Sequence, residues 1–281
     1  MDTQTVRQKT ANAHPLVSVI IPTFFSGKTV ETCLRSIRNQ SYENMEVIVV
    51  DAFSHDDTRE VAEKFGAKVF LLPDERSPAR NFGVRLAKGL FVLLVDSDME
   101  LTSNVVEECV AKCLGEDADA VIIPEESVGR SFLARCKKLE KGMRRQEFYF
   151  EAPRFFRKEV YDPLGGYDEN LVVGEDFELT HRLRTAGFVI RRCEARIRHH
   201  EENVSLKSLT AKLYYYGKKL PTYVSKEPSL SLKTSSPVHL MKNLPLLKKQ
   251  PMYFAGLCSL KLVEYTAYFV GASMNVLFSA Q

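Results

Sequence analysis

The sequence lacks the two glycine-rich signatures that most often mark a nucleotide site. No GxGxxG follows the first predicted strand, and no GxxxxGK[ST] occurs anywhere in the 281 residues. The first absence argues against a Rossmann dinucleotide site and against dehydrogenases or methyltransferases that need such a turn. The second argues against P-loop hydrolysis. A nucleotide site in this chain would therefore be built from other groups.

Other absences concern compartment and partners. The six cysteines form no CxxC pair, and residues 1–15 are polar, without the apolar run of a secretory signal. We therefore expect a loose N-terminal tail over 1–15, reduced thiols and a cytoplasmic location. The formal net charge of +3 is too small to indicate a nucleic-acid partner. The cysteines are Cys33, Cys109, Cys113, Cys136, Cys193 and Cys258.

Strand and helix patterns alternate from residue 16 onward. Apolar, β-branched runs predict buried strands, and segments with apolar residues at helical spacing lie between them. This alternation predicts an α/β fold with a mostly parallel sheet covered by helices on both faces. The predicted strands are 16–22, 45–51, 67–73, 90–98 and 119–125, and the predicted helices are 28–42, 54–66, 77–89 and 103–114.

Polar residues follow three of the predicted strands. Thr23 follows the first strand, Asp51 ends the second, and 96-DSD-98 closes the fourth. Ligands of parallel sheets bind at the carboxyl ends of the strands, so we expect these groups to converge at one edge. In an extended chain Asp96 and Asp98 point to the same side, where paired carboxylates can hold a divalent cation against phosphate oxygens. The alternative is a solvated strand end with an aspartate that caps the next helix.

Over about residues 16–200 the chain resembles the family 2 glycosyltransferases of the GT-A fold. Four segments stand in the order and spacing of that family: VSVIIPTFF (17–25), EVIVVDAFSHDDT (46–58), SPARNFGVRLAKGLFVLLVDSD (77–98) and GGYDENLVVGEDFELTHRLRTAGF (165–188). The resemblance implies a Rossmann-like sheet and an inverting transfer of a sugar from a nucleotide-diphosphate donor.

The resemblance implies that the donor binds at the carboxyl edge of the sheet. The family's loop along the base matches residues 22–24, its ribose aspartate matches Asp96, and Arg80 and Asn81 match a helix start that faces the nucleotide. Ala52 stands where the family commonly has a second, base-reading acid, so UDP and GDP both stay open. The implied nucleotide-sugar site consists of Pro22, Thr23, Phe24, Asp51, Arg80, Asp96 and Ser97.

The resemblance also implies separate places for the metal and for proton transfer. Asp98 matches the family's ligand of Mg²⁺ or Mn²⁺, and His199 or His200 could complete the metal shell, although both could equally be surface residues. Asp176 of GED matches the catalytic base that deprotonates the acceptor, and an N-cap of a helix beginning near Phe177 is the structural alternative. The implied acceptor side also includes Asp168 and Glu175.

The C-terminal part has a different character. Segment 131–147 is a basic helix, and 253–278 is a long apolar run interrupted only by Lys261 and Glu264, which share one helix face. The run is an interfacial or partner-contacting helix, a core-packing helix or a transmembrane span. Both segments suit the cytoplasmic surface of a membrane, so we expect an acceptor that is a glycan or a lipid-linked molecule such as a polyprenyl phosphate.

These patterns predict a GT-A catalytic domain over 16–225, divided into a nucleotide-sugar half at 16–125 and an acceptor half at 126–225. Residues 226–281 are predicted to form a C-terminal linker and an amphipathic, membrane-proximal helix.

Two other functions stay open. A sugar-1-phosphate nucleotidyltransferase would need a glycine-rich, arginine-containing loop after the first strand, and IPTFFSGKTV (21–30) is not such a loop. A non-catalytic module that binds a nucleotide sugar or a protein partner would be expected to have lost Asp98 or Asp176, and both are present.

Overall fold

The computed structural model describes residues 14–144, 151–200, 205–235 and 249–279. Most of the loose tail predicted over 1–15 therefore lies outside the described residues. The described chain divides into two compact units. Unit 1 takes its residues from 1–124, 152–169 and 179–198, and unit 2 takes its residues from 125–151, 170–178 and 199–281.

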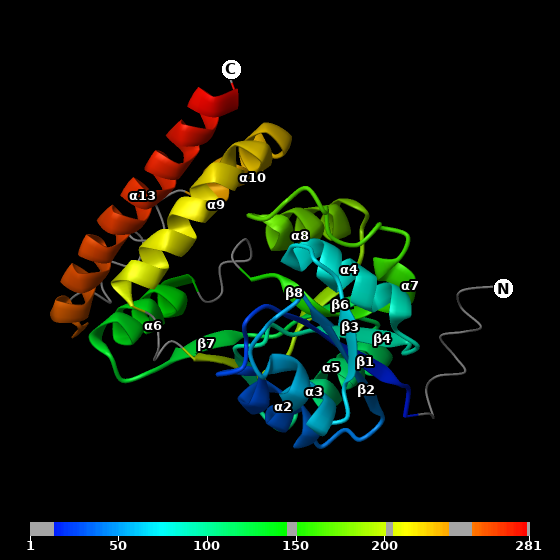
Figure 1. Ribbon diagram of the computed structural model, residues 1–281. Helices are drawn as coiled ribbons and strands as arrows, with labels where there is room; N and C mark the ends of the chain where they lie inside the picture. The colour runs from blue at the N-terminus through cyan, green and yellow to red at the C-terminus, as the bar shows by residue number, and fades with distance from the viewer. Residues whose placement is uncertain (1–13, 145–150, 201–204, 236–248, 280–281) are drawn as a thin grey trace. The chain divides into compact units, whose positions relative to one another are not determined.

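Unit 1 is built on a seven-stranded sheet (Figure 1). In spatial order its strands are β3 (Lys68–Leu71), β2 (Met45–Asp51), β1 (Val17–Thr23), β4 (Phe91–Leu94), β8 (Pro153–Arg157), β6 (Ala120–Ile122) and β9 (Ile190–Arg192). The first four of these are parallel to one another, as expected when helices carry the chain back between strands. Thr23 pairs with Asp51 at the last position of β1 and β2, so these two strands end level with each other.

Helices cover both faces of the sheet, and each face holds a separate hydrophobic core. The neighbouring residues Val19 and Ile20 of β1 lie in different cores, because successive side chains of a strand point to opposite faces. One core includes α2 (Val30–Arg38), α3 (Thr58–Lys64) and α5 (Val105–Gly115), and the other includes α4 (Arg76–Leu86), α7 (Lys158–Tyr161) and the later turns of α8 (Glu175–Thr185). The predicted α/β fold with a mostly parallel sheet is confirmed.

Two strands of this sheet, β8 and β9, were not predicted from the sequence pattern, and β8 is the one in the interior of the sheet. It lies antiparallel between β4 and β6 and so makes the sheet mixed. All five of its residues are buried, with Phe155 in one core and Phe156 in the other. Arg154 and Arg157 flank these phenylalanines and remove both the apolar run and the alternation that would mark a strand. Arg157 is accommodated because its Nε donates to the Ala118 carbonyl at 3.0 Å.

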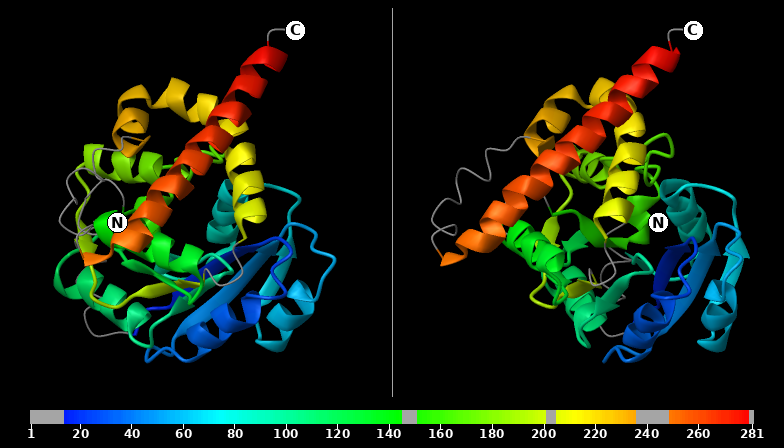
Figure 2. Two further views of the ribbon diagram at one scale, coloured as in Figure 1. Left: turned by 90° about the vertical axis from the view of Figure 1, so that its left-hand side faces the viewer. Right: turned by 60° about the vertical axis from the view of Figure 1, so that its left-hand side comes forward.

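Unit 2 is mainly helical, with α6 (Phe132–Arg144), α9 (Leu206–Lys226), α10 (Pro228–Ser235) and α13 (Pro251–Ser279). Both views of Figure 2 show α13 running alongside α9. Two glycines let their backbones meet: a Cβ on Gly217 would lie 2.4 Å from the Tyr268 carbonyl oxygen, and one on Gly271 would lie 2.2 Å from the Tyr214 carbonyl oxygen. The remaining strands are β5 (Met99–Leu101) in unit 1, β7 (Glu125–Val128) in unit 2, and β10 (Ile197–His200), which the division splits.

The two charged residues of α13 face the interior of unit 2. Lys261 Nζ lies 2.5 Å from Glu140 Oε1 and 2.5 Å from Glu264 Oε2, and Glu264 also pairs with Lys137. The prediction that Lys261 and Glu264 share one helix face is confirmed, and this face packs against α6. Within the described parts of the chain, no helix has the length and apolar character needed to cross a membrane.

We expect Gly271→Ala to lower the free energy of unfolding of unit 2 by about 1–3 kcal/mol, because the new methyl group meets a backbone carbonyl that cannot move aside. The matched control is Gly142→Ala in α6, where nothing lies within 4 Å of the added Cβ. There the gain in helix propensity should leave stability equal or higher by up to about 1 kcal/mol. Urea unfolding followed by circular dichroism measures the stability of both variants. Equal effects at Gly271 and Gly142 would contradict the close approach of the α9 and α13 backbones.

Candidate active site

One buried carboxylate ties the ends of β1 and β2 together. Asp51 is fully buried, and its Oδ2 accepts hydrogen bonds from Thr23 Oγ1 and Ser54 Oγ, each at 2.7 Å. Its Oδ1 accepts the Ser54 backbone N–H at 2.7 Å. These bonds satisfy the charge and fix the loop after β2, so Asp51 shapes the edge on which Pro22 and Thr23 lie. A direct contact between Asp51 and a nucleotide stays a prediction.

Exposed aromatic side chains stand at the same edge. Phe24 is 65% exposed and meets Phe25 edge-on, with the ring centroids 4.7 Å apart. Phe25 and Phe53 have positive φ angles of 48° and 57°, a backbone region that residues other than glycine seldom adopt. The Phe25 N–H donates a hydrogen bond to Ser54 Oγ at 2.8 Å, which helps to hold the backbone of Phe25 in this conformation. Exposed rings of this kind can stack on a flat ligand, and Phe24 is one of the residues predicted to bind the nucleotide sugar.

Asp96 is bound by arginines just beyond the end of β4. Its Oδ1 accepts a hydrogen bond from Arg80 Nη2 at 2.6 Å, and its Oδ2 lies 3.5 Å from Arg154 Nη2. Burial by itself raises the pKa of Asp96, but the charges of Arg80, Arg154 and Arg76 outweigh it and hold the pKa well below the ordinary range. Asp96 is therefore ionised, and its charge is neutralised by the protein itself.

Arg80 reaches Asp96 from inside the molecule. Its side chain is fully buried, and its guanidinium carbon lies 4.9 Å from the centroid of the Tyr167 ring. Helix α4 begins at Arg76, one residue before the predicted start at 77, and Arg80 and Asn81 stand in its second turn. The earlier start is possible because Pro78 falls in the first turn, where a missing N–H costs no helical hydrogen bond.

Asn81 holds the turn that carries Asp168. Its Nδ2 donates to the Tyr167 carbonyl at 2.8 Å and to Glu169 Oε1 at 3.0 Å, and its Oδ1 accepts the Tyr167 N–H at 2.9 Å. Gly166, with φ of 66°, passes so close that a Cβ there would lie 2.4 Å from Asn81 Oδ1. Asn81 therefore positions the GGYDE turn of unit 1, in which Asp168 is half-buried.

Asp98 follows Asp96 on the same edge and is half-buried. Burial raises the pKa of the nearby Cys33 thiol of α2, and the negative charges of Asp98 and Asp96 raise it further. Ser97, between the two aspartates, shares a 2.7 Å hydrogen bond with Ser26 in the loop after β1.

The edge that carries Asp96 and Asp98 could hold a divalent cation only if a bound ligand completed the coordination shell of the ion. Among the described residues, no three His, Cys, Asp or Glu side chains gather closely enough to hold a metal ion. Mg²⁺ is commonly bound through one or two carboxylates together with the phosphates of a substrate. Because Asp96 is already paired with arginines, the residues present fit a cation held by Asp98 and a bound diphosphate.

The remaining predicted residues belong to unit 2. Helix α8 begins at Glu175, so Asp176 lies in its first turn, and the alternative that Asp176 caps a helix starting near Phe177 is wrong. Gly174, with φ of 78°, precedes the helix and supplies the bend from which it starts. Glu175 is buried and Asp176 is half-buried at this helix N-terminus, where negative side chains are stabilised. His199 and His200 are both half-buried at the end of β10.

Comparison with known proteins identifies the family. The model of glycosyl transferase family 2 matches residues 18–160, just over half of the chain. The chain belongs to this family. Glycosyltransferase GlyG of Streptococcus pneumoniae is 34% identical over 114 residues, which are 38% of each chain. A GalNAc(5)-diNAcBac-PP-undecaprenol β-1,3-glucosyltransferase of Campylobacter jejuni is 34% identical over 106 residues, covering 35% of this chain and 34% of the relative. The family 2 chain thus spans well under two thirds of these relatives.

Solved structures support the fold of the family 2 chain. Mannosyltransferase PcManGT from Pyrobaculum calidifontis, in complex with GDP-Man and Mn²⁺, has a TM-score of 0.63 at 16% identity, covering 95% of this chain and 88% of that one. S. aureus TarS 1-349 in complex with UDP-GlcNAc has a TM-score of 0.59 at 20% identity, covering 88% and 81%. At these identities the likeness concerns the fold alone, and it confirms the predicted GT-A architecture.

Sequence reasoning missed one side chain of this edge, Arg154, and expected another, Asn81, to face the nucleotide. Arg154 contacts Asp96 from β8, a strand whose pattern was not recognised, and Asn81 turned out to hold a turn 86 residues further along the chain. The flanking of two phenylalanines by arginines in RFFR was the available signal for the first. Nothing local marks the second, because its partners are backbone groups of a distant segment.

We expect Asp96→Asn to lower the free energy of unfolding by about 3–5 kcal/mol at neutral pH, because it leaves buried guanidinium charge without its carboxylate. The control Asp162→Asn removes an exposed pair with Lys158 and should cost at most about 1 kcal/mol. Denaturant titrations measure both.

The pH dependence gives an independent check on Asp96. Since the folded pKa of Asp96 is depressed, its stabilisation is complete above the unfolded pKa of about 3.9 and is lost as the pH falls below that value. The gap in stability between wild type and Asp96→Asn should therefore narrow below about pH 4. A gap that stayed constant on acidification would contradict the ionised state.

Proposed function

We propose that this family 2 chain is a glycosyltransferase that moves a sugar, with inversion, from a nucleotide-diphosphate donor to an acceptor hydroxyl or phosphate. The observation that carries the proposal is the pair of aspartates beyond β4, of which Asp96 is paired with Arg80 and Arg154, and Asp98 follows it, half-buried, at the same edge. One carboxylate of the DSD motif would thus be structural and would help to orient the donor, and the other would face its diphosphate.

The donor half of the proposed domain is 16–125, and the rings and hydroxyls at its sheet edge would receive the nucleotide. Phe24 would stack on the base, beside Pro22 and Thr23, and Ser97 would lie toward the ribose and phosphates. The neighbours PcManGT and TarS were solved with GDP-Man and UDP-GlcNAc respectively. Either base is compatible with Ala52, which places no acid beside it.

Mg²⁺ or Mn²⁺ would be held by Asp98, with His199 or His200 as a further candidate ligand. When bound, the ion supplies charge neutralisation for the departing diphosphate. PcManGT was solved with Mn²⁺.

The acceptor half would be 126–225, with Asp176 as the general base. An acceptor hydroxyl must lose its proton as it attacks the anomeric carbon opposite the leaving nucleotide, and a carboxylate in the first turn of α8 can take that proton at its oxygen. Glu175 and Asp168 would lie on the acceptor side, the latter oriented by the turn that Asn81 holds. The Campylobacter jejuni relative is named for an undecaprenol-linked substrate, which supports a lipid-linked acceptor and a position on the cytoplasmic face of a membrane.

The two aspartates should separate in a binding and turnover experiment. UDP, GDP and their sugars are added to the protein with and without Mn²⁺, and thermal stabilisation reports binding. We expect Mn²⁺ alone to stabilise little and Mn²⁺ with one nucleotide to stabilise clearly, because the described residues offer no complete metal shell. Asp98→Ala should abolish the part of the shift that depends on metal.

Asp176→Asn should keep the full metal-dependent shift and lower turnover by about 10²–10⁴-fold, the usual contribution of a positioned base. Asp162→Asn, which changes an exposed aspartate, serves as the control for both measurements. Wild-type turnover by Asp176→Asn would overturn the base assignment, and a chain that no nucleotide stabilises would overturn the transferase proposal.

A further inference from the structure

The outward face of α13 carries no charge. The only charged residues in its sequence, Lys261 and Glu264, are buried in the ion-pair network with α6. Leu262 is 70% exposed and Phe269 is 73% exposed, and three further apolar or aromatic side chains of the helix are exposed, namely Met252, Tyr265 and Val270. In a usual surface helix the charged side chains face water and the apolar ones face the core, and in this part of α13 the arrangement is the opposite. A run of exposed apolar side chains of this kind indicates an interaction surface.

The neighbouring helix α9 supplies charge of one sign. It contains five lysines and no acidic residue. The ammonium groups of Lys212 and Lys218 lie over the rings of Tyr216 and Tyr214, with Nζ 5.6 Å and 4.8 Å from the ring centroids. A cationic helix beside an apolar one is complementary to a partner that combines hydrocarbon with negative charge.

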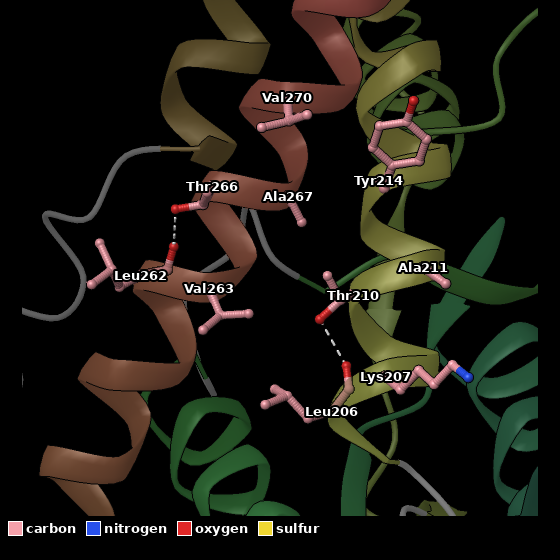
Figure 3. A pocket seen from close by; sticks show the side chains of 10 residues that line it. All are labelled: Leu206, Lys207, Thr210, Ala211, Tyr214, Leu262, Val263, Thr266, Ala267 and Val270. Atoms are coloured by element: carbon pink, nitrogen blue, oxygen red, sulfur yellow. Dashed lines mark hydrogen bonds between the residues drawn. The ribbon is translucent and has the colours of Figure 1, made fainter.

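A groove of about 930 Å³ lies between the two helices, within the range of about 300–1,000 Å³ that is usual for small-molecule sites (Figure 3). Figure 3 shows Leu206 and Leu262 at one end of the groove and Tyr214 and Val270 at the other, so the helices run in the same direction. Beyond Val270 the groove ends, because the two backbones meet at Gly217 and Gly271. Each wall covers eight residue steps of helix, or about 12 Å.

The walls of this groove suit a hydrocarbon chain. Its two threonines donate their hydroxyl protons to the carbonyl one turn earlier in their own helices, Thr210 to Leu206 at 2.7 Å and Thr266 to Leu262 at 2.8 Å (Figure 3). Those donors are therefore not directed at a ligand, and the other wall residues of α13 are apolar. The one charged residue that lines the groove is Lys207, next to Leu206 at the end away from the glycine crossing, and in Figure 3 its side chain extends on the side of α9 away from α13.

We propose that the groove between α9 and α13 takes one hydrocarbon chain of an anionic membrane lipid, with the lipid phosphate against Lys207 and the exposed face of α13 against the bilayer. Charge complementarity favours this occupant over a second copy of the chain, because neither helix presents an acidic side chain that could pair with the lysines of α9. The inference depends on unit 2 alone and is independent of the proposed transferase activity.

The test is flotation of the full chain with vesicles of phosphatidylcholine, alone or mixed with phosphatidylglycerol. We expect the wild type to float with the anionic vesicles. Leu262→Asp should weaken this binding about tenfold or more, since burial of a leucine side chain contributes about 1.5–3 kcal/mol. Lys207→Gln should weaken it about fivefold on anionic vesicles only, from the loss of about 1 kcal/mol per lysine near the surface. Leu71→Asp and Lys64→Gln, at exposed positions of unit 1, are the matched controls and should float like the wild type.

Filling the groove separates insertion of a chain from simple contact with the surface. Ala211 is exposed on the groove wall, and Ala211→Phe adds apolar area while it occupies the space of the chain. Chain insertion predicts weaker flotation for this variant, whereas flotation equal to or stronger than that of the wild type would overturn it. Circular dichroism verifies that each variant is folded, and Leu262→Ser replaces Leu262→Asp if the charge unfolds the helix.

Three results would overturn the proposal as a whole. The wild type could fail to float with either vesicle, or Leu262→Asp could float as well as the wild type. Light scattering could instead show a wild-type dimer that Leu262→Asp dissociates without any flotation, and the surface would then join two copies of the chain.

Discussion

The ion pair between Arg80 and Asp96 is the interaction on which the carboxyl edge of the sheet depends. A fully buried guanidinium is costly unless its charge and N–H groups are met, and the Asp96 carboxylate meets Arg80 there, so this pair ties α4 to the end of β4. Arg154 draws β8 to the same carboxylate, and Tyr167 lies against the guanidinium. Parallel strands, an antiparallel strand, a helix and a turn thus share one electrostatic centre, which makes the edge rigid before any ligand is considered.

This centre explains why neighbouring polar residues differ in their tasks. Asp51 and Asn81 are among the most motif-like residues of the chain, yet each uses its polar atoms on neighbouring loops and turns. They shape the edge from behind, as Asp96 does. At the same edge Phe24 is exposed, and Ser97 and Asp98 are half-buried. A preorganised binding site needs both groups, because loosely held ligand contacts lose affinity and precision.

The parallel part of the fold could be predicted from sequence because its strands are apolar runs and its helices keep a regular spacing. β8 could not, since arginines at both ends of RFFR hide a strand whose charges are satisfied only by tertiary contacts. Thr23 and Asp51 end their strands level with each other, as the strand pattern predicts, but the resemblance could not show that Asp51 and Asp96 use their oxygens to hold neighbouring parts of the fold. Such a role depends on the partners of each side chain. Tyr167, which lies against Arg80, is distant in the chain, and Ser54 contacts Asp51 through its backbone N–H.

The inward charges of α13 have a consequence for the integrity of unit 2. Removal of the chain from Pro251 onward would take Glu264 from Lys137 and Lys261 from Glu140. It would also expose the backbone of α9 at Gly217, which α13 covers. Helix α13 is therefore needed for the packing of unit 2, although its outward face is apolar. Single substitutions on the outward face of α13 can change what that face binds. Loss of the whole helix would instead leave the charges of Lys137 and Glu140 without these partners.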